Sequence, residues 1–126
     1  MEKEIGKIGW IDLSVPNADE LLPFYNAVVG WEHEAVPMRD GDTKYADYTV
    51  KPPGGEVVSG ICNARGYNAK MPAAWMIYVT VADVEAAARA CVDGGGAIVD
   101  GPKPMGEGVQ VAVLRDPAGA VFAVID

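Results

Sequence analysis

Hydrophobic and polar positions alternate along residues 8–15. Successive side chains of an extended chain point to opposite faces, so this alternation predicts a β-strand with two different faces. One face would carry Ile11, Leu13 and Val15, and the other would carry Trp10, Asp12 and Ser14. After Pro16 the apolar residues recur at helical spacing up to Gly30, which predicts a helix directly after the strand.

The same succession of patterns returns in residues 75–96, which can be laid over residues 9–30. Each stretch is an alternating run that breaks at a polar residue, continues at helical spacing and stops at glycine. The overlay makes Tyr78 the counterpart of Asp12. An internal duplication is therefore expected.

Turn signals later in each half support the duplication independently. Pro52 and Gly54 match Pro117 and Gly119, and each pair lies between two strand-like runs. Proline fixes φ and glycine accepts a positive φ, as tight turns require. The chain is accordingly predicted to contain two modules, each with the order strand, helix, strand, strand, strand.

The predicted fold is one α+β domain over residues 1–126, with module one at about 6–63, a linking loop at 63–73 and module two at about 74–126. The predicted strands are residues 8–15, 31–36, 45–50, 57–62, 75–81, 97–99, 109–114 and 121–125. The predicted helices run from a cap at Asn17 or Asp19 to Gly30, and over residues 84–93. Pro37 and the turn at 39–42 are expected to end the second strand, and residues 101–106 to form a loop.

Composition and charge narrow the possible partners. The chain has 126 residues, is 50% hydrophobic and has a formal net charge of −8 without any basic run. The acidic excess argues against nucleic acid or an anionic membrane surface as a partner, and it favours a neutral or cationic small molecule. Two cysteines, Cys62 and Cys91, suit reduced thiols better than a disulfide framework. Residues 1–7 are charged and no run approaches the length of a membrane span, so a cytoplasmic protein is expected.

Several short segments occur in an order and spacing typical of one superfamily. They are residues 10–17, Phe24-Tyr25, the helix exit Val29-Gly30-Trp31, residues 76–83 and the turn Asp116-Pro117-Ala118-Gly119. From residue 8 onward the chain thereby resembles the glyoxalase, bleomycin-resistance and extradiol-dioxygenase superfamily, also called vicinal oxygen chelate proteins. The resemblance implies two βαβββ modules that form a mixed, mainly antiparallel open barrel around a cup for metal and substrate. It also implies a homodimer.

The usual metal-ligand positions of that superfamily hold other residues here. The resemblance places ligands at Trp10 and Met76 in the first strands and at Ala123 in the last strand, while residues 57–62 offer no His, Asp or Glu. A catalytic zinc or iron site needs about three His or carboxylate ligands. The single histidine, His33, lies outside these positions and is interpreted as a surface or strand-edge residue. We therefore predict no metal and no cofactor, and we do not expect a metal-dependent glyoxalase or dioxygenase.

The resemblance also implies which side chains line the cup. Alternation would present Trp10, Asp12 and Ser14 from one module, and Met76, Tyr78 and Thr80 from the other. The last strand would add Val121, Ala123 and Ile125, and further candidates of undetermined facing are Tyr48, Cys62 and Gln110. Such an apolar and aromatic lining with few polar groups is typical of a small-molecule site. For Trp10 and Met76 the alternative, that they only fill the space of a lost metal site, stays open.

Asp12 has the strongest chemical implication in this set, because an acid in a buried strand is costly unless it is hydrogen-bonded, neutralised or solvated. A bond from Tyr78 or Ser14 without any chemistry is one interpretation. The main functional hypothesis is a metal-free, bleomycin-resistance-like protein that sequesters an aromatic or cationic molecule between Trp10, Tyr78 and Met76. One alternative is a metal-independent isomerase or lyase with Asp12 as general base and Tyr78 as acid. Another is an accessory or partner-binding module.

Overall fold

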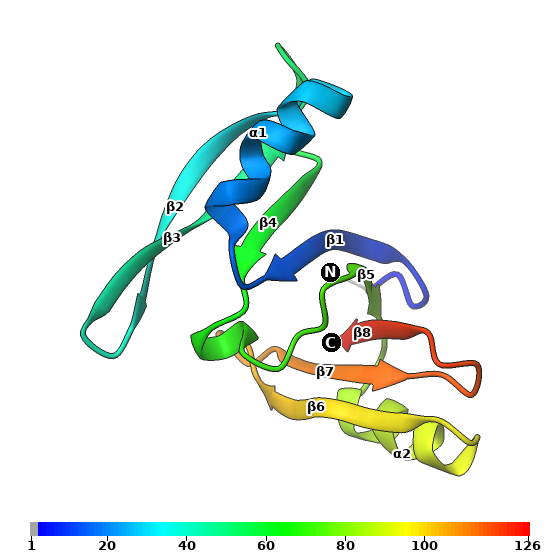
Figure 1. The fold of residues 1–126 in the computed structure, drawn as a ribbon. Helices are drawn as coiled ribbons and strands as arrows, with labels where there is room; N and C mark the ends of the chain where they lie inside the picture. The colour runs from blue at the N-terminus through cyan, green and yellow to red at the C-terminus, as the bar shows by residue number, and fades with distance from the viewer. Residues whose placement is uncertain (1–2) are drawn as a thin grey trace. The chain divides into compact units, whose positions relative to one another are not determined.

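The computed structural model describes residues 3–126, apart from the side chain of residue 67, and over that range the chain forms two α-helices and eight strands (Figure 1). In chain order these are β1 (Ile8–Val15), α1 (Ala18–Val29), β2 (Glu32–Asp40), β3 (Thr43–Lys51), β4 (Ser59–Asn63), β5 (Trp75–Thr80), α2 (Val84–Asp93), β6 (Ala97–Pro104), β7 (Gln110–Arg115) and β8 (Val121–Ile125). A short 3-10 helix, η1 (Gly66–Asn68), lies between β4 and β5. The predicted order of strand, helix, strand, strand, strand thus occurs twice. Within residues 3–126, neither α-helix has the length and apolar character that a membrane span requires.

The chain divides into two compact units. The α1 unit is Ile11–Trp75, and the α2 unit combines Met76–Asp126 with the N-terminal residues up to Trp10. The start of β1 therefore belongs with the second half of the chain. Backbone hydrogen bonds explain this assignment, because the N–H of Gly6 donates to the carbonyl of Thr80 (2.8 Å) and the N–H of Thr80 donates to that of Lys7 (2.9 Å).

The strands of both units follow the same order. In the α1 unit the order is β2-β3-β4-β1, and in the α2 unit it is β6-β7-β8-β5. The first strand of each module pairs in parallel with the last, β1 with β4 and β5 with β8, and the remaining pairs within each unit are antiparallel. Identical topology in two halves confirms the duplication, and the mixed sheet with two helices confirms the α+β class.

Helix α1 packs on one face of its strands. The buried core between α1 and the strands is formed by five residues: Leu13, Val15, Ala18, Val50 and Ile61. The α1 side chains packed against this core are Leu21, Leu22 and Tyr25. Burying one such aliphatic side chain contributes roughly 1.5–3 kcal/mol, so this core holds α1 on the face that the alternation of β1 predicted.

Helix α2 packs in the equivalent way. Its buried residues, Val84 and Ala88, contact Ala112 and Leu114 of β7 and Val124 of β8. The short alanine side chains in this helix allow it to lie close to the strands. The first turn of α2 is also tied to the last residue of the chain.

The carboxylate of Asp126 joins that first turn to the strands. Its Oδ2 accepts a hydrogen bond from the N–H of Val84 (3.1 Å), and its Oδ1 accepts one from the N–H of Gln110 (2.9 Å). The bond from Gln110 is the main cause that lowers the pKa of Asp126, because donors stabilise the charged form. The bond from Val84 satisfies one of the backbone donors that a helix leaves open at its start.

Strand β2 is longer than predicted. The strand was expected to end at Pro37, but it continues to Asp40, and Pro37 pairs with Ala46 of β3. A proline lacks the N–H that a central strand needs, and it is tolerated here because β2 is an edge strand. The hairpin turn is Gly41-Asp42, where Gly41 has a φ of 60°.

Strand β6 is also longer than predicted. The expected loop at residues 101–106 is partly strand, because β6 runs to Pro104. The pairing of β6 with β7 shifts register on either side of Asp100, which absorbs the irregular residues. Gly101 makes this possible: it has a φ of 83°, and a Cβ there would lie 2.7 Å from the carbonyl oxygen of Val111.

The two helices begin differently. The Oδ1 of Asp83 accepts a hydrogen bond from the N–H of Ala86 (3.1 Å) and so caps α2. Asn17 has the N-cap position of α1, as predicted, but its side chain caps no backbone N–H. Its amide Nδ2 donates instead to Oε2 of Glu20 (3.0 Å).

This difference predicts unequal effects of two matched substitutions. Asp83→Ala should lower the free energy of unfolding by about 1 kcal/mol, because it removes a side-chain cap. Asn17→Ala should cost much less, since no such bond is lost. Urea unfolding followed by circular dichroism measures both, and equal losses would contradict the assignment of the caps.

Candidate functional site

The strand face of the α1 unit that α1 leaves uncovered carries the predicted acid. Asp12 and Ser14 alternate with the β1 residues of the α1 core, so they lie on the opposite face. Ser14 pairs with Cys62 of β4, and Asp47 of β3 is within hydrogen-bonding reach of the Cys62 thiol. We name these four residues, Asp12, Ser14, Asp47 and Cys62, the acidic face.

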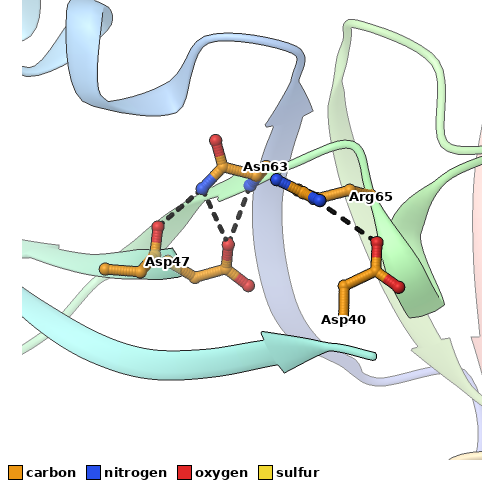
Figure 2. Close-up of polar contacts among 5 residues, drawn as sticks. Asp40, Asp47, Asn63 and Arg65 are labelled. Carbon is orange, nitrogen blue, oxygen red and sulfur yellow. Dashed lines mark hydrogen bonds and ion pairs between the residues drawn. The ribbon is translucent and has the colours of Figure 1, made fainter. Parts of the chain in front are cut away.

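Asp47 is held in place by the end of β4 (Figure 2). Its Oδ1 accepts hydrogen bonds from the backbone N–H of Asn63 (2.8 Å) and from Asn63 Nδ2 (3.3 Å). The same Nδ2 donates to the carbonyl oxygen of Ala46 (2.6 Å). Asp47 is only 7% exposed. Such donors stabilise a buried carboxylate and fix its orientation.

Cys62 lies between two carboxylates. Burial raises the pKa of its thiol to about 12, and the negative charges of Asp12 and Asp47 add to the increase. A thiolate next to two acids in a partly buried site is unfavourable, so the thiol remains neutral at physiological pH. Cys62 is therefore unsuited to nucleophilic catalysis, and the negative charge of the acidic face comes from the two carboxylates.

Arg65, which follows β4, contacts Asp40 of β2 and Tyr45 of β3. The Nε of Arg65 is 3.4 Å from Oδ2 of Asp40, and its guanidinium lies 5.0 Å from the centre of the Tyr45 ring (Figure 2 shows the pair with Asp40). Burial raises the pKa of Tyr45, and the charges of Asp47 and Asp40 raise it further, while Arg65 opposes them. Arg65 is thus already bound by an acid and an aromatic ring.

The uncovered strand face of the α2 unit is apolar. Tyr78 of β5 pairs with Ala123 of β8, which in turn pairs with Val113 of β7. These residues alternate with those packed under α2, so they lie on the opposite face. Tyr78 is 7% exposed, and Met76, two residues earlier on the same strand, is also buried.

The remaining candidates from the sequence lie as follows. Trp10 is half-buried at the end of the β1 segment that belongs to the α2 unit. Thr80 pairs with Ile125, in line with Tyr78 and Ala123. Val121 is half-buried at the start of β8.

Two candidates of undetermined facing lie on the helix sides of their strands. Tyr48 packs against the α1 core, and its ring is perpendicular to the His33 ring, with 5.5 Å between the two ring centres. Gln110 lies on the same face of β7 as Ala112 and Leu114, which is the α2 side. Neither residue shares a strand face with Asp12 or Tyr78.

The residues present do not fit a catalytic metal. Among the described residues, no three His, Cys, Asp or Glu side chains are grouped so that they could hold a metal ion. Trp10, Met76 and Ala123 have no side-chain donor suited to zinc or iron. His33 lies exposed on β2.

Sequence reasoning missed Asp47, although a signal for it was present. Along β3, Ala46, Tyr48 and Val50 alternate with Tyr45 and Asp47. Once one face is assigned to the helix, the other must present the acid. Asn63, the donor that holds Asp47, lies at the strand end where no periodic signal exists.

The comparisons with known proteins assign the family. The sequence profile described as "Glyoxalase/Bleomycin resistance protein/Dioxygenase superfamily" matches residues 7–124. The chain therefore belongs to this superfamily, as the short segments in its sequence suggested.

Curated relatives are about twice as long as this chain. It is 31% identical over 120 residues to the "Putative glyoxylase CFP32" of Mycobacterium tuberculosis, a match that covers 94% of this chain and 45% of that protein. It is 28% identical over 131 residues to the "Anthracycline biosynthesis protein DnrV" of Streptomyces peucetius, covering 94% and 46% respectively. The chain thus spans slightly less than half the length of these relatives.

Solved structures share the fold. A hypothetical protein from Bacillus halodurans C-125 matches with a TM-score of 0.58 at 17% identity, covering 98% of this chain and 94% of that one. A variant of the Streptomyces coelicolor methylmalonyl-CoA epimerase in complex with 2-nitronate-propionyl-CoA matches with a TM-score of 0.55 at 18% identity, covering 97% of each chain. At these identities the likeness concerns the fold alone.

The raised pKa of Cys62 predicts slow alkylation. In a Cys91→Ser background, iodoacetamide at pH 8 should modify Cys62 about a thousandfold more slowly than a thiol of pKa 9, because the thiolate forms only as the pH approaches about 12. Asp47→Asn should speed the reaction by removing one negative charge. Asp93→Asn, an exposed change of the same charge, should not. Mass spectrometry follows the reaction, and rapid alkylation at pH 8 would contradict the assignment.

The side chains also predict that no catalytic metal binds. Protein purified without chelators should contain only substoichiometric zinc, iron and manganese, because the ligand set is missing among the described residues. Elemental analysis measures the content. Stoichiometric metal that is lost in Asp12→Asn or Asp47→Asn would show that the acidic face is a metal site.

Proposed function

We propose that the protein binds and sequesters a small organic cation with an aromatic part, without a metal. The observation that carries the proposal is the acidic face, where Asp12 and Asp47 flank a thiol that stays neutral. Because the thiol is uncharged, it does not offset the negative charge of the two carboxylates. A positively charged group placed against them would be attracted by each.

The surroundings of the two carboxylates determine how strongly they attract a cation. At 4 Å, two opposite unit charges attract by about 4 kcal/mol at an effective dielectric constant of 20, before desolvation is counted. Arg65, which follows β4, is already bound to Asp40 and Tyr45. The overall charge of −8 also raises the local concentration of cations.

Within the α2 unit, Trp10, Met76 and Tyr78 support the binding of an aromatic molecule, as the sequence predicted. Aromatic rings bind organic cations through their faces, with a contribution of about 0.5–2 kcal/mol for each contact. The name of one relative refers to anthracycline biosynthesis, and anthracyclines are polycyclic aromatic molecules of the kind that stacks on such rings.

The alternative to sequestration is catalysis by the same residues, and an experiment must distinguish the two. An isomerase or lyase would use Asp12 as the base and Tyr78 as the acid, so its activity would depend on the Asp12 carboxylate more than its affinity would. A partner-binding module would use neither residue for a small molecule. The homodimer and the cytoplasmic location stay predictions, and the exposed Phe24, Val28 and Val29 of α1 offer an apolar surface for self-association.

A charged and a neutral probe of the same shape test the proposal. At pH 7, 1-naphthylmethylammonium should raise the unfolding temperature more than 1-naphthol does at equal concentration. A ligand at a hundredfold excess over its Kd stabilises by about 2.7 kcal/mol, well within the range of a thermal-shift assay. A wider screen of organic cations would then identify tighter ligands.

Three variants separate the functional classes. Asp12→Asn should weaken binding of the cation by about tenfold, which corresponds to about 1.4 kcal/mol, and Trp10→Ala should remove most of the affinity. Asp93→Asn is the control, since it changes the net charge equally at an exposed helix position. Equal stabilisation by 1-naphthylmethylammonium of the unaltered protein and of Asp12→Asn would overturn the proposal. Turnover of a screened compound that Asp12→Asn abolishes while binding persists would establish the enzyme instead.

A further inference from the structure

A concave site lies on the helix side of the strands of the α1 unit. An open pocket of about 420 Å³ is lined by Ile11, Trp31, Val58, Ser59 and Trp75, all within this one unit. Ile11 shares its face of β1 with the residues of the α1 core. The pocket therefore lies on the helix side of the strands, away from the acidic face, and we name it the outer pocket.

The aromatic wall of the outer pocket is held in place by α1. The ring of Tyr25 lies 5.6 Å from that of Trp31 and 5.5 Å from that of Trp75, and the two indole rings are 5.5 Å apart at 68°. The Nε1 of Trp75 donates to the hydroxyl of Tyr25 (3.1 Å), and Nδ2 of Asn26 donates to the carbonyl of Trp31 (3.0 Å). A wall positioned by these contacts loses little conformational freedom when a ligand binds.

The polar groups of the outer pocket already have partners. The hydroxyl of Ser59 donates to the carbonyl oxygen of Ile11 (2.6 Å), and the indole N–H of Trp75 is used by Tyr25. No charged side chain is among the described residues that line it. A charged ligand would be desolvated here without compensation, so the chemistry of the pocket selects a neutral one.

The apolar residues of the pocket remain accessible. Trp75 and Ile11 are each 38% exposed and Val58 is 47% exposed. Covering apolar surface contributes about 25 cal/mol per Å², and ring pairs gain further from edge-to-face contact. A volume of about 420 Å³ is near the lower end of the range of small-molecule sites, which suits a ligand of two fused rings.

We propose that the outer pocket binds a small neutral aromatic molecule, at a site separate from the acidic face. Flat rings would lie against Trp31 and Trp75, with Ile11 and Val58 covering their edges. The inference does not depend on the proposed function, because the two sites lie on opposite faces of the strands and select opposite ligand charges.

Fluorine NMR on protein labelled with 5-fluorotryptophan tests the proposal directly. The chain has three tryptophans, so Trp10→Phe, Trp31→Phe and Trp75→Phe assign the three resonances. Titration with 1-naphthol should shift the Trp31 and Trp75 resonances with one saturable Kd and leave Trp10 unchanged. A shift confined to Trp10, or no saturable shift at millimolar probe, would overturn the proposal.

A matched pair of charge insertions locates the site. Val58→Asp places a carboxylate in the pocket at an exposed position before β4, and it should raise the Kd for 1-naphthol at least tenfold. Val92→Asp, at an exposed position on α2, should leave that Kd unchanged, and so should Asp12→Asn, which tests the acidic face separately. An unchanged Kd in Val58→Asp would overturn the proposal. Conversion of a dimer to a monomer by Val58→Asp, without saturable naphthol binding in the unaltered protein, would also overturn it by assigning the pocket to an interface between copies.

Discussion

The packing of α1 against the strands of its unit determines which side chains can meet a ligand. Leu13 and Val15 of β1 are buried beneath the helix, and strand geometry then forces Asp12 and Ser14 to the other face. The parallel pairing of β1 with β4 brings Cys62 beside Ser14. A shift of one residue in this register would exchange the two faces, so the chemistry of the acidic face depends on the burial of two aliphatic side chains.

The same constraint acts in the α2 unit with a different outcome. There α2 packs on Ala112, Leu114 and Val124, and the opposite face presents Tyr78 and Ala123. Duplication therefore preserved the topology while the chemistry of the face opposite the helix diverged, since an acid in one copy corresponds to a tyrosine in the other.

Electrostatics distinguish the acidic face of the α1 unit from its outer pocket. On the acidic face, Asp47 is fixed by Asn63, and the pKa of Cys62 rises to about 12 because burial and two carboxylates disfavour a thiolate. In the outer pocket the polar atoms are bonded internally and the lining is apolar. We therefore propose a surface suited to a cation on one side of the strands of this unit and a surface suited to a neutral ring on the other.

The sequence by itself determined the duplication, the α+β class and the facing of β1, because alternation, helical spacing and glycine stops are local patterns that burial of one face imposes. It also identified Asp12 as an unusual strand residue. Only the tertiary structure decided that β2 continues through Pro37, because an edge strand tolerates the missing N–H. Asp47, Asn63 and the aromatic contacts of Tyr25 likewise depend on pairing between residues distant in the sequence. No local pattern encodes which distant strand supplies a neighbour, and the neighbours determine the charge and shape of both sites.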